Sequence, residues 1–362
     1  MMKQRVLITH QLATDLAKAI SECEHDRIFV LTDDTTRMEC WPVIESFISM
    51  RGAHVISIAP GDIHKNVESL IYVWRELERG RATRHSLLVN LGGGMVTDLG
   101  GFAASTFKRG IDFINCPTTT LSMIDSSLAM VDASVGGKTG INLDSFKNEV
   151  GVFNESKFVL LDTEFLRTLD GKNLRSGYGE MIKHGLISDT ETWAELLNFD
   201  LGNPDFKLLL TMLAKSVKVK ERVVTEDPKE KGIRKALNFG HTFGHAFESF
   251  SLIHDGEKGK EPVLHGYAVA YGLICELYLS VMKQQFPTDK MTQTVRYIRE
   301  SYGMMDITCD DYDELVDIMR HDKKNTSGKI NFTLLSDIGN IHINQTATDE
   351  EIKQCLDFFR EG

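Results

Sequence analysis

The feature that most constrains the fold is an alternation, in the first half of the chain, of short apolar runs with helix-length segments. The apolar runs lie at residues 5–9, 27–32, 54–59, 86–91, 113–116 and 158–162. Runs of this length are typical of strands that are buried on both faces, and the segments between them favour βαβ units. The sequence therefore predicts an α/β unit with a largely parallel sheet.

The second half of the chain has a different pattern. From about residue 173, apolar residues recur at three- and four-residue spacing over residues 205–224, 235–250 and 267–282, which predicts helices. A strand pair is expected only near the end, at residues 329–335 and 340–344. We therefore expect two domains, an α/β domain over residues 1–172 and a mainly α-helical domain over residues 173–362.

Charge and cysteine usage limit the partners and the compartment. The 41 Lys and Arg residues against 52 Asp and Glu give a net charge of -11, which disfavours binding to nucleic acid or to an anionic membrane. No segment approaches the roughly 18 apolar residues of a membrane span, and the start lacks the apolar stretch of a signal peptide. The six cysteines are scattered, as is typical of reduced thiols. We expect a cytoplasmic protein.

Two glycine-rich segments could bind a phosphate group. Residues 92–98 (GGGMVTD) follow a predicted strand, so backbone N–H groups could approach a pyrophosphate, although Thr97 stands where the dinucleotide fingerprint needs glycine. Residues 135–140 (VGGKTG) resemble the end of a phosphate loop but lack its first glycine. A tight connection and a surface turn are the alternative interpretations of the two segments.

A histidine pair suggests a metal site. His241 and His245 are four residues apart, hence on one face of a helix, and Asn238 is expected to share that face. The zinc peptidase glutamate is missing, because Thr242 follows His241. Glu180 and His265 could complete a Glu/His/His set with an open position, but nothing in the spacing selects them.

Eight segments in this order resemble the 3-dehydroquinate synthases, a family of sugar-phosphate cyclases that shares its fold with metal-dependent polyol dehydrogenases. They are residues 92–98 (GGGMVTD), 107–110 (FKRG), 117–119 (PTT), 131–140 (VDASVGGKTG), 147–148 (KN), 180–183 (EMIK), 234–245 (RKALNFGHTFGH) and 264–266 (LHG). The resemblance implies conversion of 3-deoxy-D-arabino-heptulosonate 7-phosphate to 3-dehydroquinate and phosphate in the shikimate pathway. NAD+ would oxidise the C5 hydroxyl transiently, which permits β-elimination of phosphate, re-reduction, ring opening and aldol closure.

The resemblance also implies roles for individual residues. The metal ligands would be Glu180, His241 and His265, holding Zn2+ or alternatively Co2+. The Rossmann-like first domain would bind NAD+ through Asp33, Asp62, Lys65, Gly93, Gly94, Met95, Asp98, Thr118, Thr119, Lys147, Phe165 and Thr168. The catalytic residues would be His245, Glu230 and Lys183. The remaining substrate-binding set would be Arg109, Asp132, Lys138, Asn148, Lys220, Arg234, Asn238, His265, Lys323 and Lys324.

The implied assembly is a homodimer in which Arg109 reaches across the interface. The chain departs from the family pattern at Thr35 and Ser176, where asparagine is common, and in two further places. Residues 121–127 are followed at once by a similar copy at 128–134, so either Asp125 or Asp132 could take the substrate-binding role, and we favour Asp132. Tyr267 stands where many members have a glutamate after His-Gly, which would remove a carboxylate near the metal.

Three alternatives to the synthase remain. The first is another sugar-phosphate cyclase, and the second is a metal-dependent polyol or glycerol dehydrogenase of the same fold. The third is a protein that binds ligand without turnover because the repeat disturbs its loop. The cations Lys138, Lys220 and Arg234 argue against the dehydrogenase, because an uncharged polyol does not need them.

Overall fold

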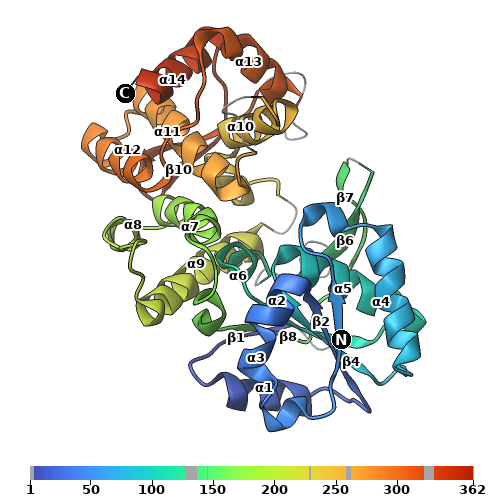
Figure 1. Cartoon of the computed structure of the whole chain (residues 1–362). Helices are drawn as coiled ribbons and strands as arrows, with labels where there is room; N and C mark the ends of the chain where they lie inside the picture. Colours follow the sequence, from blue (N-terminus) through green and yellow to red (C-terminus); the bar gives the residue numbers. More distant parts are fainter. Residues whose placement is uncertain are drawn as a thin grey trace. The chain divides into compact units, whose positions relative to one another are not determined.

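The computed structural model describes residues 4–126, 137–144, 146–227, 230–257, 262–321 and 330–361. The chain divides into two compact units, of which the first comprises residues 1–170 and 205–217 and the second residues 171–204 and 218–362. Helix α9 (Phe206–Glu226) begins in the first unit and ends in the second (Figure 1). The division thus differs from the expected domains mainly in where residues 205–217 belong.

The first unit is built on a parallel sheet of six strands in the order β1-β8-β5-β4-β2-β3 (Figure 1). The strands are β1 (Arg5–Ile8), β2 (Ile28–Asp33), β3 (His54–Ile58), β4 (Leu87–Gly92), β5 (Asp112–Pro117) and β8 (Phe158–Leu161). Each overlaps a predicted strand, so the prediction of an α/β unit with a parallel sheet is confirmed. All six residues of β4 and all four of β8 are buried, which is why both strands read as continuous apolar runs.

Six helices accompany this sheet in the described part of the first unit. They are α1 (Leu12–Ser21), α2 (Asp34–Glu39), α3 (Trp41–Ile44), α4 (Val67–Arg79), α5 (Gly94–Thr106) and α6 (Thr120–Ser126). Helices α4 and α5 carry the apolar cluster of the core: Val73 and Leu99 belong to the same buried cluster as Leu31 and Ile56 of the strands. This packing fixes the glycine turn between β4 and α5.

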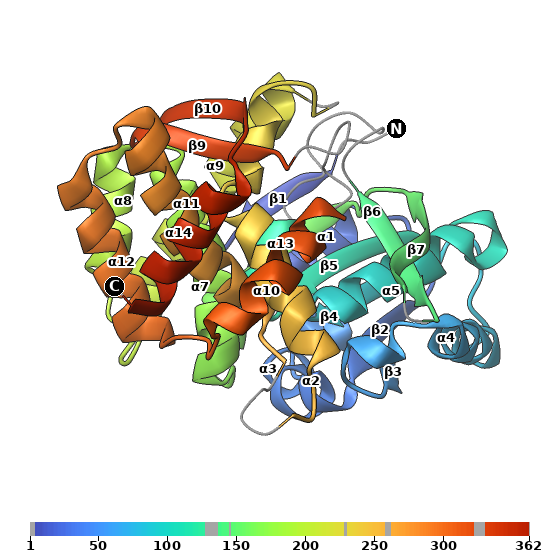
Figure 2. The same ribbon diagram turned by 90° about the horizontal axis from the view of Figure 1, so that it is seen from above.

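An antiparallel hairpin of β6 (Lys138–Leu143) and β7 (Phe146–Phe153) lies against α5 (Figure 2). Ile141 is part of the same core cluster, and Val152 packs against it. The two strands approach closely at their glycines, since a Cβ at Gly151 would lie 2.1 Å from the Thr139 carbonyl oxygen. The apolar pattern of residues 138–153 does not predict this hairpin.

The described part of the second unit is mainly helical. Its elements are α7 (Gly171–Leu186), α8 (Thr190–Leu197), α10 (His241–Ile253), α11 (His265–Gln284), α12 (Thr288–Tyr302), α13 (Tyr312–Arg320), α14 (Asp349–Glu361) and the hairpin of β9 (Phe332–Asp337) and β10 (Asn340–Gln345). Helix α11 contacts α7, α10, α12, α14 and β9 and is thus the centre of this unit (Figure 1). The predicted helical domain and its terminal strand pair are confirmed.

One predicted helix is wrong in its extent. Residues 235–250 do not form one helix, because a 3-10 turn at Ile233–Asn238 precedes α10, which begins only at His241. Gly240 separates the two with a φ of +80°, the left-handed conformation that glycine adopts without strain. Asn238 therefore lies outside the helix that carries His241 and His245, so the shared helical face expected for it is wrong.

Candidate metal centre and neighbouring polar sites

Three side chains from three helices of the second unit converge on one point. Glu180 lies on α7, His241 is the first residue of α10, and His265 is the first residue of α11. The Glu180 Oε1 atom lies 3.4 Å from His241 Nε2 and 3.5 Å from His265 Nε2. One ligand atom from each residue lies within 4.8 Å of the other two. The structure thus brings together the set that spacing alone could not select.

The cluster fits a tetrahedral metal. Ligand bonds of about 2.0–2.2 Å place the ligand atoms of such a site about 3.3–3.6 Å apart, close to the separations from Glu180 to the two imidazoles. Glu180 Oε1 is buried and accepts no hydrogen bond from the described residues. Its near neighbours are the two imidazole Nε2 atoms at 3.4 and 3.5 Å, an arrangement that a cation shared by the three side chains explains.

The other ring nitrogens of the two histidines have acceptors. His241 Nδ1 lies 3.2 Å from the Phe239 carbonyl oxygen, and His265 Nδ1 lies 2.9 Å from Glu248 Oε2. An Nδ1–H that donates to these groups leaves Nε2 with its lone pair directed at the metal position. His265 therefore has a carboxylate partner at Nδ1, which Glu248 supplies from α10.

Charge in the centre is balanced by a buried lysine. Lys183 Nζ donates to Glu180 Oε2, and both side chains are buried. Burial opposes ionisation of Glu180, but Lys183 and His241 hold the pKa of this carboxyl well below its usual value. Burial alone would lower the pKa of His265, but the Glu180 and Glu248 carboxylates outweigh it and raise that pKa to about 10.

A second buried histidine lies close to these cations. His184 on α7 is fully buried. Burial, followed by the charge of Lys183, holds the pKa of His184 well below its usual value, and Lys220 acts in the same direction. Lys220 is itself buried on α9. The surroundings of the cluster thus combine a neutral imidazole with ammonium groups suited to an anion.

His245, expected to be catalytic, lies beside the cluster. Its ring centroid is 5.3 Å from that of His241 and 6.0 Å from that of His265. Another expected pair is also in contact, because Asn238 Nδ2 donates to Glu230 Oε1 over 3.0 Å. The Arg234 backbone N–H donates to Asp227 Oδ2 over 3.1 Å.

In the first unit, several expected cofactor residues form one polar cluster. Lys65 is buried, and its Nζ lies 3.1 Å from Asp98 Oδ2 and 3.6 Å from Asp62 Oδ1. It also donates to Asn148 Oδ1 over 2.7 Å. Sequence reasoning missed Asn142, which donates to Asp62 Oδ2 and accepts from the Asn148 N–H. Asn142 has no motif of its own, so no sequence signal identified it.

The expected phosphate turn has the predicted local structure. Strand β4 ends at Gly92, Gly93 is the N-cap of α5, and a Cβ at Gly94 would have no neighbour within 4 Å. The Thr118 N–H donates to the Gly92 carbonyl oxygen over 3.0 Å, which holds the next loop beside this turn. Within the part of the chain that the structure describes, the start of α5 at Gly94 therefore leaves room for an anion.

The other expected residues are placed separately. Asp33 caps α2 by accepting from the Thr36 N–H, Met95 is half-buried, and Phe165 is buried in a 3-10 turn at Thr163–Leu166. The exposed ones are Arg109, Lys138, Lys147 and Thr168. Asp132, Lys323, Lys324 and the side chain of Asp125 lie outside the described residues.

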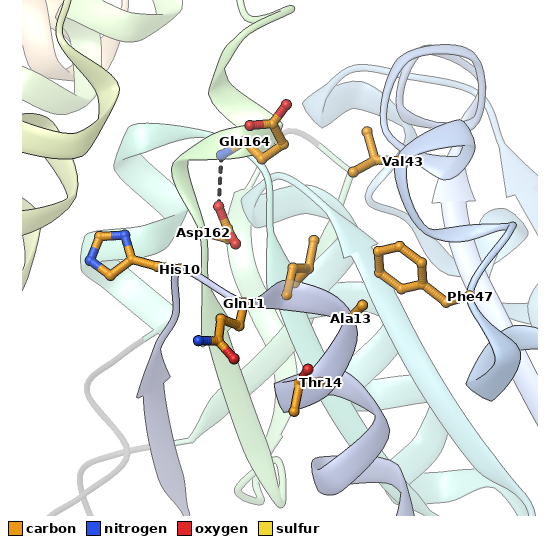
Figure 3. Close-up of a pocket in the computed structure, with 9 residues that line it drawn as sticks. His10, Gln11, Ala13, Thr14, Val43, Phe47, Asp162 and Glu164 are labelled. Atoms are coloured by element: carbon orange, nitrogen blue, oxygen red, sulfur yellow. Dashed lines mark hydrogen bonds between the residues drawn. The ribbon is translucent and has the colours of Figure 1, made fainter.

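A cavity of about 350 Å³ in the first unit holds none of the expected site residues. It lies just after β1 and β8 and is lined in part by His10, Thr14, Phe47 and Asp162 (Figure 3). Asp162 accepts from the Glu164 N–H over 2.9 Å, and burial raises the pKa of this carboxyl. Polar lining alone assigns no ligand to this cavity.

The fold as a whole matches solved structures. A 2-epi-5-epi-valiolone synthase from Streptomyces hygroscopicus subsp. jinggangensis 5008, solved with NAD+ and Zn2+ bound, superposes with a TM-score of 0.81 at 24% identity, over 100% of this chain and 98% of that one. A 2-deoxy-scyllo-inosose synthase complexed with carbaglucose-6-phosphate, NAD+ and Co2+ gives 0.80 at 24% identity, over 99% and 96%. The fold is that of the sugar-phosphate cyclases.

Sequence comparison narrows the class to one family. The 3-dehydroquinate synthase N-terminal pattern matches residues 55–176, and the 3-dehydroquinate synthase C-terminal pattern matches residues 177–325. A 3-dehydroquinate synthase of Parabacteroides distasonis is 49% identical over 362 residues, which cover 100% of this chain and 99% of that protein. The chain belongs to the 3-dehydroquinate synthase family. Among the described residues, no helix is both long and apolar enough to cross a membrane.

Proposed function

We propose that the chain converts 3-deoxy-D-arabino-heptulosonate 7-phosphate to 3-dehydroquinate and phosphate, as a carbon–oxygen lyase of the shikimate pathway. The observation that carries this proposal is the 49% identity to a 3-dehydroquinate synthase over the full chain. In this reaction the C5 hydroxyl is oxidised, phosphate and the C6 proton are eliminated, and the C5 ketone is reduced again. Ring opening and an intramolecular aldol reaction then close the carbocycle that leads to chorismate and the aromatic amino acids.

The metal would be held by Glu180, His241 and His265, with Zn2+ as the first expectation and Co2+ as the alternative. Their separations, and the burial of Glu180 Oε1 beside both imidazoles, support this assignment. A bound divalent ion would polarise the substrate hydroxyls and ease loss of the C5 proton. Three protein ligands leave a position of a tetrahedral site open for substrate.

The first unit would bind NAD+, whose nicotinamide accepts a hydride reversibly. Gly93 and Gly94 place the N-terminus of α5 where a pyrophosphate could accept backbone hydrogen bonds. The buried Lys65, held by Asp98, adds a cation to the same unit. The expected cofactor set is completed by Asp33, Asp62, Met95, Thr118, Thr119, Lys147, Phe165 and Thr168.

Cations of this chain would recognise the carboxylate and the phosphate of the substrate. Lys183 and Lys220 are buried near the metal cluster, where low solvent exposure strengthens their attraction for an anion. The family resemblance adds Arg109, Lys138, Arg234, Lys323 and Lys324 as charged groups and Asp132, Asn148 and Asn238 as polar ones. A substrate with two anionic groups explains why an acidic chain keeps such a set.

Proton transfer would involve His245 and Glu230. His245 lies beside the imidazoles of His241 and His265, so its ring would be placed to exchange a proton with a substrate hydroxyl bound there. Glu230 is fixed by Asn238 and would orient or accept a proton at the same substrate. The departing phosphate can itself take the C6 proton, so these residues need to move few protons.

One assay tests the proposal and separates it from its alternatives. The full chain is incubated with the heptulosonate phosphate, catalytic NAD+ and Zn2+, and both phosphate and dehydroquinate are followed. Equal release of the two products is expected. Stoichiometric NADH would indicate a polyol or glycerol dehydrogenase, and turnover of a different heptulose or hexose phosphate alone would indicate another cyclase. Substrate binding without turnover would indicate an inert member.

The enzyme would act as a homodimer. The β6–β7 hairpin carries Phe146 and Phe153, whose exposed fractions are 65% and 58%, together with Leu143 and Val150. Exposed apolar side chains on the edge strands of a two-stranded sheet are typical of a surface that another chain covers. Arg109 would then reach the partner's substrate. Sedimentation of the wild type and of Phe146→Ser tests this, with dissociation expected for the variant.

The expected compartment is the cytoplasm. All six cysteines are free, and five of them are buried. Reduced thiols are typical of a reducing compartment. A secreted protein could also keep six titratable thiols, so a thiol count does not decide the compartment. Cell fractionation is the deciding measurement.

A further inference from the structure

Helices α10 and α11 are linked by two reciprocal contacts, each from a glutamate of one helix to the beginning of the other. Each helix begins with one of the metal-ligand histidines, His241 on α10 and His265 on α11. Each also carries a glutamate that contacts the beginning of the other helix: Glu248 of α10 contacts His265, and Glu276 of α11 contacts the residues around His241. None of the roles assigned above uses Glu248 or Glu276.

Glu276 fixes the backbone on both sides of His241. Its Oε2 accepts from the Gly240 N–H over 2.7 Å, and its Oε1 accepts from the Thr242 N–H over 3.0 Å and from the Phe243 N–H over 3.4 Å. The side chain is fully buried. The N-cap residue of α10 is a glycine without a capping side chain, so the orphan amides of this helix start are satisfied from α11. A negative charge at a helix N-terminus is also electrostatically favourable.

Glu248 fixes the imidazole of His265. Its Oε2 lies 2.9 Å from Nδ1, and the glutamate side chain is mostly buried. This contact selects the tautomer with the proton on Nδ1 and turns Nε2 toward Glu180. Among the described residues, Glu248 is the carboxylate that reaches Nδ1 of this ring, while Glu180 lies at Nε2.

Helical spacing brings each glutamate to the face of its own histidine. Glu248 follows His241 by seven residues, and Glu276 follows His265 by eleven, which are two and three turns at 3.6 residues per turn. One face of each helix therefore presents a ligand at its start and a carboxylate for the neighbouring ligand further along. Displacing either helix disturbs both histidines.

We propose that Glu248 and Glu276 are positioning residues that together preorganise the metal centre, an inference that rests on the proposed binding of a divalent metal. Glu248 orients the ring of one ligand, and Glu276 holds the backbone from which the other ligand projects. Neither is among the residues proposed to hold the metal or the substrate. The two contacts act on different atoms, so their substitutions have different signatures.

The test measures Zn2+ affinity of the metal-stripped full chain by competition with a chromogenic chelator. Glu248→Gln is expected to weaken Zn2+ binding by about 10–100-fold, the usual effect of losing such a partner, while the melting temperature of the metal-free protein changes little. Glu276→Gln places an amide NH2 against backbone N–H donors, so it is expected to lower both metal affinity and metal-free stability. Glu300→Gln, an exposed carboxylate on α12 paired with Arg296, serves as the matched control.

A Co2+-loaded sample adds a readout that a purely structural role would not change. The visible absorption of tetrahedral Co2+ is expected to shift in Glu248→Gln and to stay unchanged in Glu300→Gln. Wild-type Zn2+ affinity and an unaltered Co2+ spectrum in Glu248→Gln would overturn the inference and leave the proposed function intact. Failure of the wild type to bind either ion would overturn the metal assignment and the inference with it.

Discussion

Substitution of Gly272 by alanine tests whether close helix packing shapes the metal centre. Gly272 lies on α11 against the start of α10. A Cβ at this position would lie 1.9 Å from the Gly240 carbonyl oxygen and 2.7 Å from the Gly244 nitrogen. Both are backbone atoms, which no side-chain rotation can move away. The added methyl group must therefore push α11 away from the start of α10, which carries His241 and the backbone N–H groups that donate to Glu276.

The expected magnitude follows from that distance. A contact of 1.9 Å must open by about 1.5 Å to reach ordinary van der Waals separation. Overpacking of this kind costs about 1–3 kcal/mol and occasionally more, while the better helix propensity of alanine returns about 1 kcal/mol. Because the clash is with rigid backbone, we expect a cost in the upper part of the overpacking range. After the gain in helix propensity, this leaves a net decrease of about 2 kcal/mol in the free energy of unfolding. For a domain of this size that corresponds to a melting temperature about 4–8 °C lower.

The affinity for Zn2+ should change more strongly than the free energy of unfolding. Ligand constellations need to be held within about 0.5 Å, and a movement of α10 relative to α11 changes the separation of His241 from His265. We therefore expect Gly272→Ala to bind Zn2+ at least about tenfold more weakly than the wild type. The assays are thermal unfolding of the metal-free chain and chelator competition.

Gly171→Ala is the matched control, since a Cβ there meets only the end of the flexible Arg175 side chain at 2.8 Å. It should change stability by no more than about 0.5 kcal/mol and leave Zn2+ affinity unchanged. A Gly272→Ala variant with wild-type stability and wild-type Zn2+ affinity would refute the reasoning that this glycine sets the approach of the two helices.

Three further predictions concern the metal, pH and the repeat. His241→Ala should lose Zn2+ binding and activity together, and chelation of the wild type should stop turnover until Zn2+ or Co2+ is returned; full activity in the variant would exclude the metal assignment. Because burial raises the pKa of Asp162 above 3.8, the folded state binds this proton more tightly than the unfolded state, and stability falls as pH rises from 3.8 through the folded value. Asp162→Asn keeps the acceptor for the Glu164 N–H, so the variant should melt at a higher temperature than the wild type at pH 7, with no such gain below pH 3.8. If the variant and the wild type melted at the same temperature at both pH values, this prediction would be contradicted. For the repeat, Asp132→Asn should lower kcat more than Asp125→Asn, and the reverse order would assign the role to the first copy.

The six sheet strands could be predicted from sequence because burial of a strand on both faces requires a continuous run of apolar residues. Strands such as β4 and β8 are covered on both faces, so nearly every residue must be apolar. The β6–β7 hairpin gives no such signal. Its second strand is largely exposed, and the polar run Lys147, Asn148 and Glu149 precedes Val150 and Gly151, so neither a continuous apolar run nor a clear period of two is present.

The end of the predicted helix at residues 235–250 was misplaced for a different reason. Apolar spacing continues through Leu237, Phe239 and Phe243, so periodicity indicates no break. The break arises where Gly240 adopts a positive φ and Glu276 accepts the amides that follow it. Its partner stands 36 residues away in the sequence. A local pattern cannot report a helix start that is capped by another helix.

The arrangement of the metal centre depends on contacts between helices that are distant in the sequence. The spacing of His241 and His245 suggested a site, but the ligands that join His241 come from α7 and α11, and no local period relates Glu180 to His265. What brings those two helices together is a contact between glycines, because a Cβ at Gly179 would lie 2.3 Å from the Gly266 carbonyl oxygen. Gly266 directly follows His265, and Gly179 directly precedes Glu180. The ligand geometry is thus decided by Gly179 and Gly266, which lie next to the ligands Glu180 and His265. Because glycine has no side chain that could bind a metal, a search for metal-ligating residue types does not identify these two positions.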